Sequence, residues 1–209
     1  MMTAAVRGSR RDRKEARHAE IIEAAFHEFA AHGFAATRLD DVAARVGVTK
    51  GSLYLYYASK EELFDAMVRQ QITQTLIDDT PPGDATAATA AVQLAAVLRD
   101  YYDRYARDSR TRELLRLIIA EGGKFPDLIE FYHHEVFARV FAGLRRVLEI
   151  GVARGEFRAV AADSFVLVSF APVLEAAIWR LVYTDRYPLD LDAHFALHCD
   201  LILNGLRTR

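Results

Sequence analysis

The chain has 209 residues, 52% of them hydrophobic and 27% charged, with a formal net charge of −2, which excludes disorder as its main state. Its single cysteine, Cys199, excludes an internal disulfide, and the N-terminus lacks the apolar core of a signal peptide. No uncharged apolar run approaches the roughly 18 residues that a membrane-spanning helix needs. We therefore predict a cytoplasmic protein of one or two soluble domains that does not span a membrane.

Charge is distributed unevenly along the chain. Residues 1–60 hold 10 Lys and Arg against 7 Asp and Glu, whereas residues 61–209 hold 17 against 22. A basic N-terminal arm over residues 1–16 would favour phosphate binding, although a solvated terminus without a partner explains the same composition equally well. The basic residues at this end are Arg7, Arg10, Arg11, Arg13, Lys14 and Arg17.

Helical periodicity starts soon after the basic arm. Over residues 21–30 apolar side chains recur at steps of three and four, which predicts an amphipathic helix, and Gly33 supplies a left-handed stop. Thr37 with Asp40 resembles a capping box for a short second helix that should end at Gly47. The first part of the chain is therefore predicted to be two helices joined by a short connection.

Two further helix starts follow closely. Thr49 can cap a third helix and Ser59 a fourth, whose first turn carries Glu61 and Glu62, where acidic side chains interact favourably with the helix dipole. The fourth helix should continue to a breaker at residues 80–84, which contains two prolines and a glycine. This breaker is predicted to be a turn between helices.

Beyond the breaker the pattern stays helical and shows no strand alternation. The predicted helices cover residues 85–106, 110–121, 129–155, 162–183 and 189–206. The helix at 162–183 is apolar on nearly every side, which is typical of a buried helix. We therefore predict an all-α fold of about nine helices.

Residues 39–57 meet the requirements of a DNA-binding helix-turn-helix unit. Such a unit needs a small residue where its helices cross, a turn residue that tolerates positive φ, and apolar residues that clamp the second helix. Ala43, Gly47 and Leu53 supply these features. The outer face of residues 50–56 should then point away from the core and fit a major groove. An apolar Leu55 on this face is otherwise unexplained.

The same segment resembles a known family. Gly33-Phe34 with Thr37, followed by GVTKGSLYLYYASKEELF from residue 47 to residue 64, is closely similar to the DNA-binding domain of the tetracycline-repressor (TetR) family. The similarity extends over residues 15–65 and its motif is highly specific. It is therefore the strongest single indication of function in the sequence.

The resemblance implies an organisation and a mechanism. A helix-turn-helix DNA-binding domain of three helices would occupy residues 17–62, and a helical ligand-binding and dimerisation domain residues 63–209. The protein would bind a palindromic double-stranded DNA operator as a homodimer, probing two successive major grooves, and a small lipophilic or aromatic effector would release it. The alternative is an architectural DNA-binding protein that is insensitive to ligand.

Carried over position by position, the resemblance implies two sets of DNA contacts. Family members more often carry an aromatic residue, histidine or arginine at position 55, so Leu55 leaves the operator sequence open. The implied base-reading positions are Lys50, Gly51, Ser52 and Leu55, and the implied phosphate-contacting positions are Thr37, Tyr54, Tyr56 and Lys60.

Elementary physical chemistry supports part of this surface independently. Ser59 caps the fourth helix, whose free N–H groups form an anion site together with Lys60. Arg38 could reach a phosphate or a base edge, although a surface arginine fits equally well. Tyr54 and Tyr56 also have an alternative as core or boundary aromatics. Tyr57 is the better candidate for the core.

A ligand pocket would lie in the helical body, where aromatic residues are frequent. Aromatic residues at helical spacing pack helices more often than they bind ligands, so most of them are expected to be core. The residues we single out as candidate pocket residues are Arg104, Tyr105, Phe131, His134, Phe170 and Trp179.

The resemblance assigns dimerisation to the last two long helices of the body, which best match residues 130–152 and 162–183. The apolar stripe of the first of these is wider than one core needs, so it could serve its own core and a partner together. The candidate interface residues are Phe137, Phe141, Leu144, Leu148 and Ile178.

Other chemistry has weaker support. His194 and His198 have metal-ligand spacing beside Cys199, but a solvent-facing or partner-facing helix explains them without a metal. The sequence contains neither a phosphate-binding glycine loop nor a nucleophile elbow. We therefore predict no catalytic residues, no metal, no cofactor and no enzymatic activity, with an enzyme that uses the helical body as the remaining rival.

Overall fold

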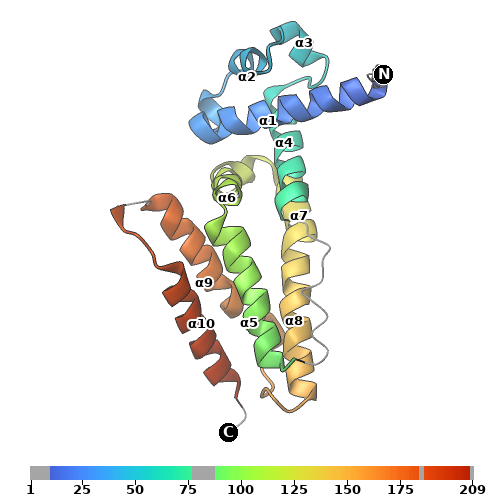
Figure 1. The fold of residues 1–209 in the computed structure, drawn as a ribbon. Coiled ribbons are helices and arrows are strands. Elements are labelled where there is room, and N and C mark those ends of the chain that lie inside the picture. The colour runs from blue at the N-terminus through green and yellow to red at the C-terminus, as the bar shows by residue number, and fades with distance from the viewer. Residues whose placement is uncertain (1–9, 77–87, 184–185, 208–209) are drawn as a thin grey trace, which may run out of the picture. The chain divides into compact units, whose positions relative to one another are not determined.

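The computed structural model describes residues 10–76, 88–183 and 186–207, and these ranges are helical apart from their connections (Figure 1). α7 (Pro126–Tyr132) and α8 (Ala138–Ala153) are joined by a π-helical turn into one continuous helix. Counted in this way, the described ranges hold nine α-helices. Their one β-type pairing is an isolated antiparallel bridge between Phe157 and Arg207. The predicted all-α class is confirmed.

The chain divides into two compact units after Gln71. We call the residues up to Gln71 the head and those from Ile72 onward the body. The division falls inside α4 (Lys60–Thr75), later in this helix than the predicted boundary between residues 62 and 63. The assignment of residues 1–16, 17–62 and 63–209 to an arm, a DNA-binding domain and a ligand-binding domain stays a prediction.

The head contains α1 (Arg10–Ala36), α2 (Leu39–Val46), α3 (Lys50–Tyr54) and most of α4. Gly33 has φ 72° and ψ 173°, so the regular helix of α1 breaks where a left-handed stop was predicted. α1 already begins at Arg10, so residues 10–16 of the predicted basic arm are helical. Residues 1–9, including Arg7, lie outside the described residues.

Two of the predicted helix caps are present in the head. The Thr49 hydroxyl oxygen accepts a hydrogen bond from the backbone N–H of Ser52 at 3.1 Å and starts α3. The Ser59 hydroxyl oxygen accepts from the N–H of Glu62 at 3.0 Å, while the Glu62 carboxylate accepts from the N–H of Ala58 at 2.6 Å. This pattern resembles a capping box at the start of α4, except that Glu62 accepts from the residue before the N-cap Ser59.

The predicted capping box of Thr37 with Asp40 is wrong. The N-cap of α2 is Arg38, which makes no side-chain cap hydrogen bond. The Thr37 hydroxyl instead points back along the chain, 2.7 Å from the carbonyl oxygen of Gly33 and 3.1 Å from that of Glu28. The hydroxyl thus bonds to carbonyl oxygens of α1 and makes no cap for α2.

Apolar side chains of all four helices form the core of the head. The rings of Phe29 and Phe34 lie 5.0 and 5.2 Å from that of Phe64 and pack edge to face with it. The buried carboxylate of Glu28 pairs with Arg45 of α2 at 2.7 Å, which ties α1 to α2. Fully buried residues of this core include Ile21, Ile22, Phe29, Val42, Leu53, Leu63, Phe64 and Met67.

The body is a set of packed helices whose bounds agree with the predicted ranges to within a few residues; the predicted start at residue 85 lies outside the described residues. In addition to α7 and α8, its elements are α5 (Ala90–Tyr101), the π-helical segment η1 (Tyr102–Arg107), α6 (Ser109–Glu121), the 3-10 turn η2 (Gly122–Lys124), the π-helical segment η3 (His133–Phe137), α9 (Ala162–Val182) and α10 (Leu191–Leu206).

α9 packs against α5, α6, η1, α8 and α10. By length and composition alone it is long and apolar enough to cross a membrane. The search of the sequence for uncharged apolar runs did not detect this, because the helix contains charged residues. Core helices of soluble proteins share this property, and one face of α9 is buried among the other helices. The buried residues of this face are Phe165, Val166, Ser169, Phe170, Val173, Ala176 and Ala177. α9 therefore contributes one face to the core of the body, and the expectation of a buried helix holds for that face only.

Candidate nucleic-acid interface

The turn between α2 and α3 has the geometry that a helix-turn-helix unit requires. Gly47 ends α2 with φ 76° and ψ 34°, a left-handed conformation that glycine adopts without strain. The N–H of Val48 donates to the carbonyl oxygen of Ala43 at 2.9 Å and closes the turn. Ala43 is buried, as a small residue at a helix crossing should be. The sequence therefore predicted this turn correctly.

α3 has one buried side and one exposed side. Leu53 is fully buried, whereas the side chain of Leu55 is 86% exposed and that of Tyr54 is 46% exposed. Lys50 and Gly51 are exposed as well. Leucines two positions apart therefore have opposite environments, because the first is clamped in the core and the second lies where the chain leaves α3. This exposed side is the surface that the sequence assigned to base reading.

A cleft beside α3 brings several predicted residues together. It encloses about 550 Å³ between the start of α2, α3 and the start of α4. Four predicted DNA contacts are among its lining residues, and they are accompanied by two acidic residues, Asp40 and Glu61. The lining consists of Arg38, Leu39, Asp40, Lys50, Tyr54, Ala58, Ser59, Lys60 and Glu61.

Lys60 lies in this cleft with its ammonium group already bonded. Its Nζ donates to the carbonyl oxygens of Phe34, Thr37 and Ala35 at 2.7, 3.0 and 3.2 Å. The same Nζ lies 4.6 Å from the centre of the Phe34 ring. All three N–H donors of the ammonium group can thus be used within the head. Lys60 therefore holds the α1–α2 connection against the start of α4, and its positive charge stays in the cleft.

Thr37, implied by the resemblance as a phosphate contact, is not on the surface. Its side chain is 2% exposed and its hydroxyl is bonded to carbonyl groups of α1. A buried hydroxyl cannot reach a phosphate without a rearrangement of the head. Thr37 accordingly stabilises the α1–α2 connection and is left out of the proposed surface.

The three tyrosines at the end of α3 and directly after it have different environments. Tyr57 is buried and its hydroxyl lies 3.2 Å from Nδ1 of His18 on α1, as expected for a core residue. Tyr56 is half-buried, and its ring packs edge to face with His18 at 4.8 Å. The contact with His18 links two points 38 residues apart in the chain, and no local pattern could have predicted it. Tyr54 is the most exposed of the three.

The exposed side of α3 carries a pair of opposite charges. Nζ of Lys50 lies 2.9 Å from Oδ2 of Asp40 on α2. The hydrogen bond with this carboxylate, and its charge, raise the pKa of Lys50. The Ser52 hydroxyl lies 2.9 Å from that of Thr49, so it too has an intramolecular partner. The sequence assigned Asp40 only to a helix start and missed its pairing with Lys50.

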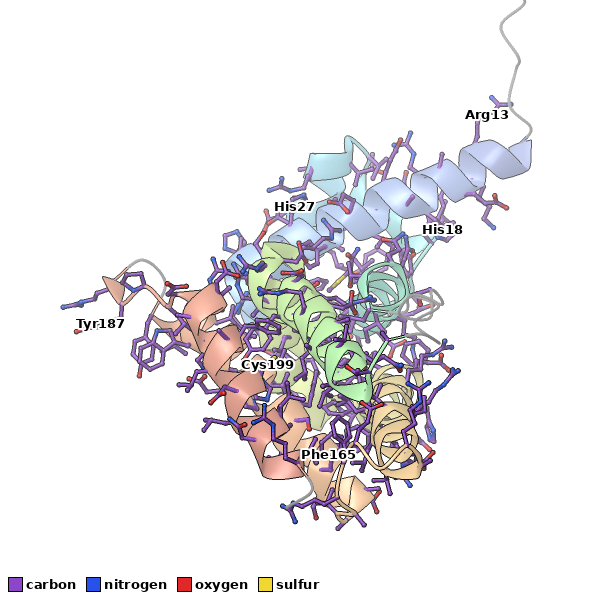
Figure 2. The ribbon with its side chains drawn as sticks, turned by 60° about the horizontal axis from the view of Figure 1, so that its bottom comes forward. Arg13, His18, His27, Phe165, Tyr187 and Cys199 are labelled. Atoms are coloured by element: carbon purple, nitrogen blue, oxygen red, sulfur yellow. The ribbon has the colours of Figure 1, made fainter. Side chains whose placement is uncertain are left out.

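The start of α1 adds exposed basic residues to the head. Arg13 and Lys14 are exposed, and Arg17 pairs with Glu20 at 2.8 Å. Figure 2 shows Arg13 near the beginning of α1, with His18 and then His27 further along the same helix. Arg13 and Lys14 therefore present positive charge from a helix.

In the body, two of the six predicted pocket residues come together in an aromatic cluster. The ring of Phe170 lies 5.2 Å from that of Tyr105, 5.5 Å from that of Tyr101 and 6.0 Å from that of Phe137. Tyr132 packs against Phe137 at 5.4 Å. Burial raises the pKa of Tyr101 to about 12, and it also raises that of Tyr105. These hydroxyls are therefore neutral in an apolar interior.

None of the other four predicted pocket residues has a ring contact with Phe170 among the contacts described, although the charge of Arg104 acts on both Tyr101 and Tyr105. Arg104 pairs with Asp100 at 3.0 Å, and His134 is exposed on η3. The ring of Trp179, beyond the middle of α9, lies 4.4 Å from that of Tyr183 at a tilt of 48°, and Phe131 is half-buried on α7. Helical spacing alone did not distinguish the aromatic side chains that meet from those that do not.

The predicted dimer residues fall into two groups, those buried inside the body and those at least partly exposed. Leu144 and Leu148 are 0% and 3% exposed within the body, so assigning them to a partner surface was wrong. Phe137 and Phe141 are half-buried, and Ile178 is exposed. The stripe of α8 is wide because α5 and α9 both pack against it. Exposed apolar side chains instead gather on α9 and α10 and include Leu167, Val168, Ile178, Val182, Leu197 and Leu201.

The two histidines of α10 have a partner within the body. The Tyr102 hydroxyl lies 2.8 Å from Nδ1 of His194 and 3.3 Å from Nδ1 of His198. Nε2 of His194 pairs with Glu175 at 3.3 Å. Burial, with a smaller effect of His194, lowers the pKa of His198 to about 4. These contacts account for the spacing of the histidines through a polar cluster in the body.

Comparison with known families gives matches in both units. Residues 21–67 match the family described as bacterial regulatory proteins, tetR family. Residues 92–181 match the C-terminal domain of AefR-like transcriptional repressors. The first match spans α2, α3 and parts of α1 and α4, and the second extends from α5 into α9.

Individual proteins agree with these families. The chain is 34% identical over 143 residues to the HTH-type transcriptional repressor SCO4008 of Streptomyces coelicolor, an alignment that covers 66% of this chain and 68% of that protein. A regulator from Saccharomonospora viridis in complex with choline has TM-score 0.71 at 18% identity, covering 94% of this chain and 100% of that one. FadR from Bacillus subtilis in complex with stearoyl-CoA has TM-score 0.63 at 20% identity, covering 91% and 100%. Both structures share the fold of this chain.

Proposed function

The chain belongs to the TetR family of bacterial transcriptional regulators, and on this basis we propose that it is a repressor that binds a palindromic operator as a homodimer and is released by a small effector. The observation that carries the proposal is the 86% exposure of Leu55 beside a helix-turn-helix turn whose core residues Val42, Ala43 and Leu53 are buried. An exposed leucine in this position is suited to the methyl group of thymine in a major groove.

The base-reading set we propose is Lys50, Gly51, Ser52 and Leu55. Lys50 supplies a donor for guanine, Ser52 a hydroxyl, and Gly51 a close approach of the backbone. Their exposure, or half-burial for Ser52, supports this role.

The phosphate contacts we propose are Arg38, Tyr54, Tyr56 and the basic start of α1. Lys60 adds positive charge near the start of α4, whereas its hydrogen bonds go to the chain's own carbonyl groups. The Lys60→Ala variant would therefore mix a binding effect with a structural one. Tyr54→Phe, which removes one exposed hydroxyl, is the better test of a phosphate contact, because it should lower affinity for all sequences alike.

Homodimerisation is supported by the exposed apolar residues of α9 and α10. Val168 and Val182 on α9, and Leu197 and Leu201 on α10, are each 60% exposed or more. Apolar side chains of this size are favourably buried against a second copy. A symmetric pair would place two α3 helices in successive major grooves about 34 Å apart.

Release by a lipophilic or aromatic effector is supported by the aromatic cluster around Phe170. This cluster includes Tyr101 and Tyr105, whose hydroxyls can orient a polar group on an otherwise apolar ligand. The neighbours bound to stearoyl-CoA and choline are examples of this fold with ligands of different chemistry. If an effector weakens DNA binding by a given factor, DNA must weaken effector binding by the same factor.

Selection of bound sequences from random duplex DNA tests the proposal. We expect a palindromic sequence to be enriched, and lipophilic compounds added during the selection to reduce the bound fraction. Leu55→Ala should change the enriched sequence. Salt-dependent binding without a preferred palindrome would overturn the operator and support the architectural alternative. Enrichment that is unaffected by every compound would overturn effector release.

A further inference from the structure

The ion pair between Asp40 and Lys50 lies on the surface that the proposed function directs toward DNA. Lys50 is the first residue of α3, Asp40 is the second residue of α2, and both line the cleft that also contains Arg38 and Tyr54. Nζ and Oδ2 are 2.9 Å apart, and the two side chains are 48% and 58% exposed. The lysine therefore reaches DNA only by leaving the carboxylate or by bringing it along.

A carboxylate in this position opposes the negative charge of DNA, and helix capping does not explain it. The N-cap position of α2 is Arg38, and no side chain makes the cap hydrogen bond there. Asp40 and Asp41 both lie in the first turn of α2, where acidic side chains interact favourably with the helix dipole. The dipole accounts for both residues equally, whereas the pairing with Lys50 distinguishes Asp40.

The ion pair between Lys50 and Asp40 is weak enough for a DNA group to replace the carboxylate. An ion pair between two half-exposed side chains contributes little to stability, because water and salt screen it. The negative charge of the Asp40 carboxylate repels a phosphate that approaches Lys50, whereas a neutral guanine edge, which offers two acceptors, is not repelled in this way. The carboxylate also raises the pKa of Lys50, so the ammonium stays charged in both situations.

We infer that Asp40 determines specificity by holding the Lys50 ammonium away from the phosphate backbone until a base edge accepts it. This inference rests on the proposed function of the head. On a random sequence the pair stays closed, and Lys50 adds no phosphate contact. On the operator the lysine donates to bases, and the carboxylate is left to water or to a cytosine amino group.

Substitution of the carboxylate tests the inference, with a neighbour of the same charge as the matched control. Asp40→Asn and Asp41→Asn each remove one negative charge from the first turn of α2, but only the first releases Lys50. Affinity for the selected operator and for a random duplex would be measured at several salt concentrations. Thermal melting of each variant checks that the head remains folded.

We expect Asp40→Asn to raise affinity for random DNA roughly three- to tenfold more than Asp41→Asn does, since one additional phosphate contact is formed. The slope of log K against log salt should become steeper by about 0.9. Operator affinity should rise less, so the ratio of operator to random binding falls. In a Lys50→Gln background, the two asparagine substitutions should have equal effects.

Equal effects of Asp40→Asn and Asp41→Asn in the presence of Lys50 would overturn the inference, because charge alone would then explain both. A surviving difference in the Lys50→Gln background would also overturn it. Failure of the proposed function gives a different result: the unmodified protein would then select no operator at all.

Discussion

The head and the body are both helical, but they place their functional side chains by different means. In the head, a left-handed glycine, two capped helix starts and one buried leucine determine which side of α3 is exposed. In the body, Tyr102 meets His194 and His198 across more than ninety residues of sequence. A surface built from turns and caps can be recognised in the sequence, whereas a cluster built from distant helices cannot.

The largest effect on stability should come from truncating the buried one of two leucines in the head. Leu53→Ala removes a fully buried side chain and should lower the free energy of unfolding by about 2–5 kcal/mol. Leu55→Ala, at a site that is 86% exposed, should change it by less than about 0.5 kcal/mol and alter operator preference instead. Chemical denaturation measures the free energy of unfolding of both variants, and selection of bound sequences measures operator preference. Similar losses of stability in the two variants would mean that Leu55 is buried in solution.

The next effect concerns the polar cluster of the body. His198 has a pKa of about 4 in the folded chain, below the ordinary value of 6.5, so the unfolded chain takes up its proton first as the pH falls. Stability is therefore complete above pH 6.5 and decreases toward pH 4, by at most about 3 kcal/mol at 1.36 kcal/mol per pKa unit.

Thermal melting between pH 7 and pH 4 measures this loss. The His198→Gln variant removes the titrating ring and serves as the control, so its melting temperature should depend less steeply on pH over the same range. Identical pH profiles of the two proteins would show that His198 is not responsible.

Substitution of Gly151 tests how closely the side chains of the body are packed. A Cβ atom at this position would overlap the ring of Phe157, so Gly151→Ala should destabilise the protein by about 1–3 kcal/mol through overpacking. Gly205 on α10 has no neighbouring atom in the way, and Gly205→Ala should stabilise the helix by up to about 1 kcal/mol. Thermal melting should therefore shift in opposite directions. A shift in the same direction would contradict the close approach at Gly151.

The smallest effect on stability is expected from removing a threonine helix cap, and the head and the body offer one such cap each for comparison. Thr49 caps α3 and Thr89 caps α5, each through a hydrogen bond from a backbone N–H three residues later. Replacing either by alanine should cost about 1 kcal/mol of stability. Only Thr49→Ala should weaken operator binding as well, because α3 carries the base-reading residues. Equal loss of operator binding in both variants would show that the effect is one of general stability.

Several predicted site residues show why prediction from sequence was incomplete. Thr37 and Lys60 match positions of a family motif, yet the motif does not reveal that carbonyl groups of the same head already engage them. Leu144 and Leu148 belong to a stripe wide enough for two partners, and the second partner proved to be another helix of the same body. Phe137 is half-buried and packs against Phe170, and its place in an interface stays a prediction.

The sequence by itself determined the helices, the caps of α3 and α4, the left-handed turn at Gly47 and the exposed side of α3, because each depends on residues only a few positions apart. Tertiary structure alone decided that Lys50 pairs with Asp40, that Lys60 bonds to the end of α1, and which aromatic residues meet around Phe170. Helical periodicity specifies that a side chain lies on an apolar or a polar face. The choice of the group opposite that face depends on how separate helices pack, and this information is not contained in any short stretch of the chain.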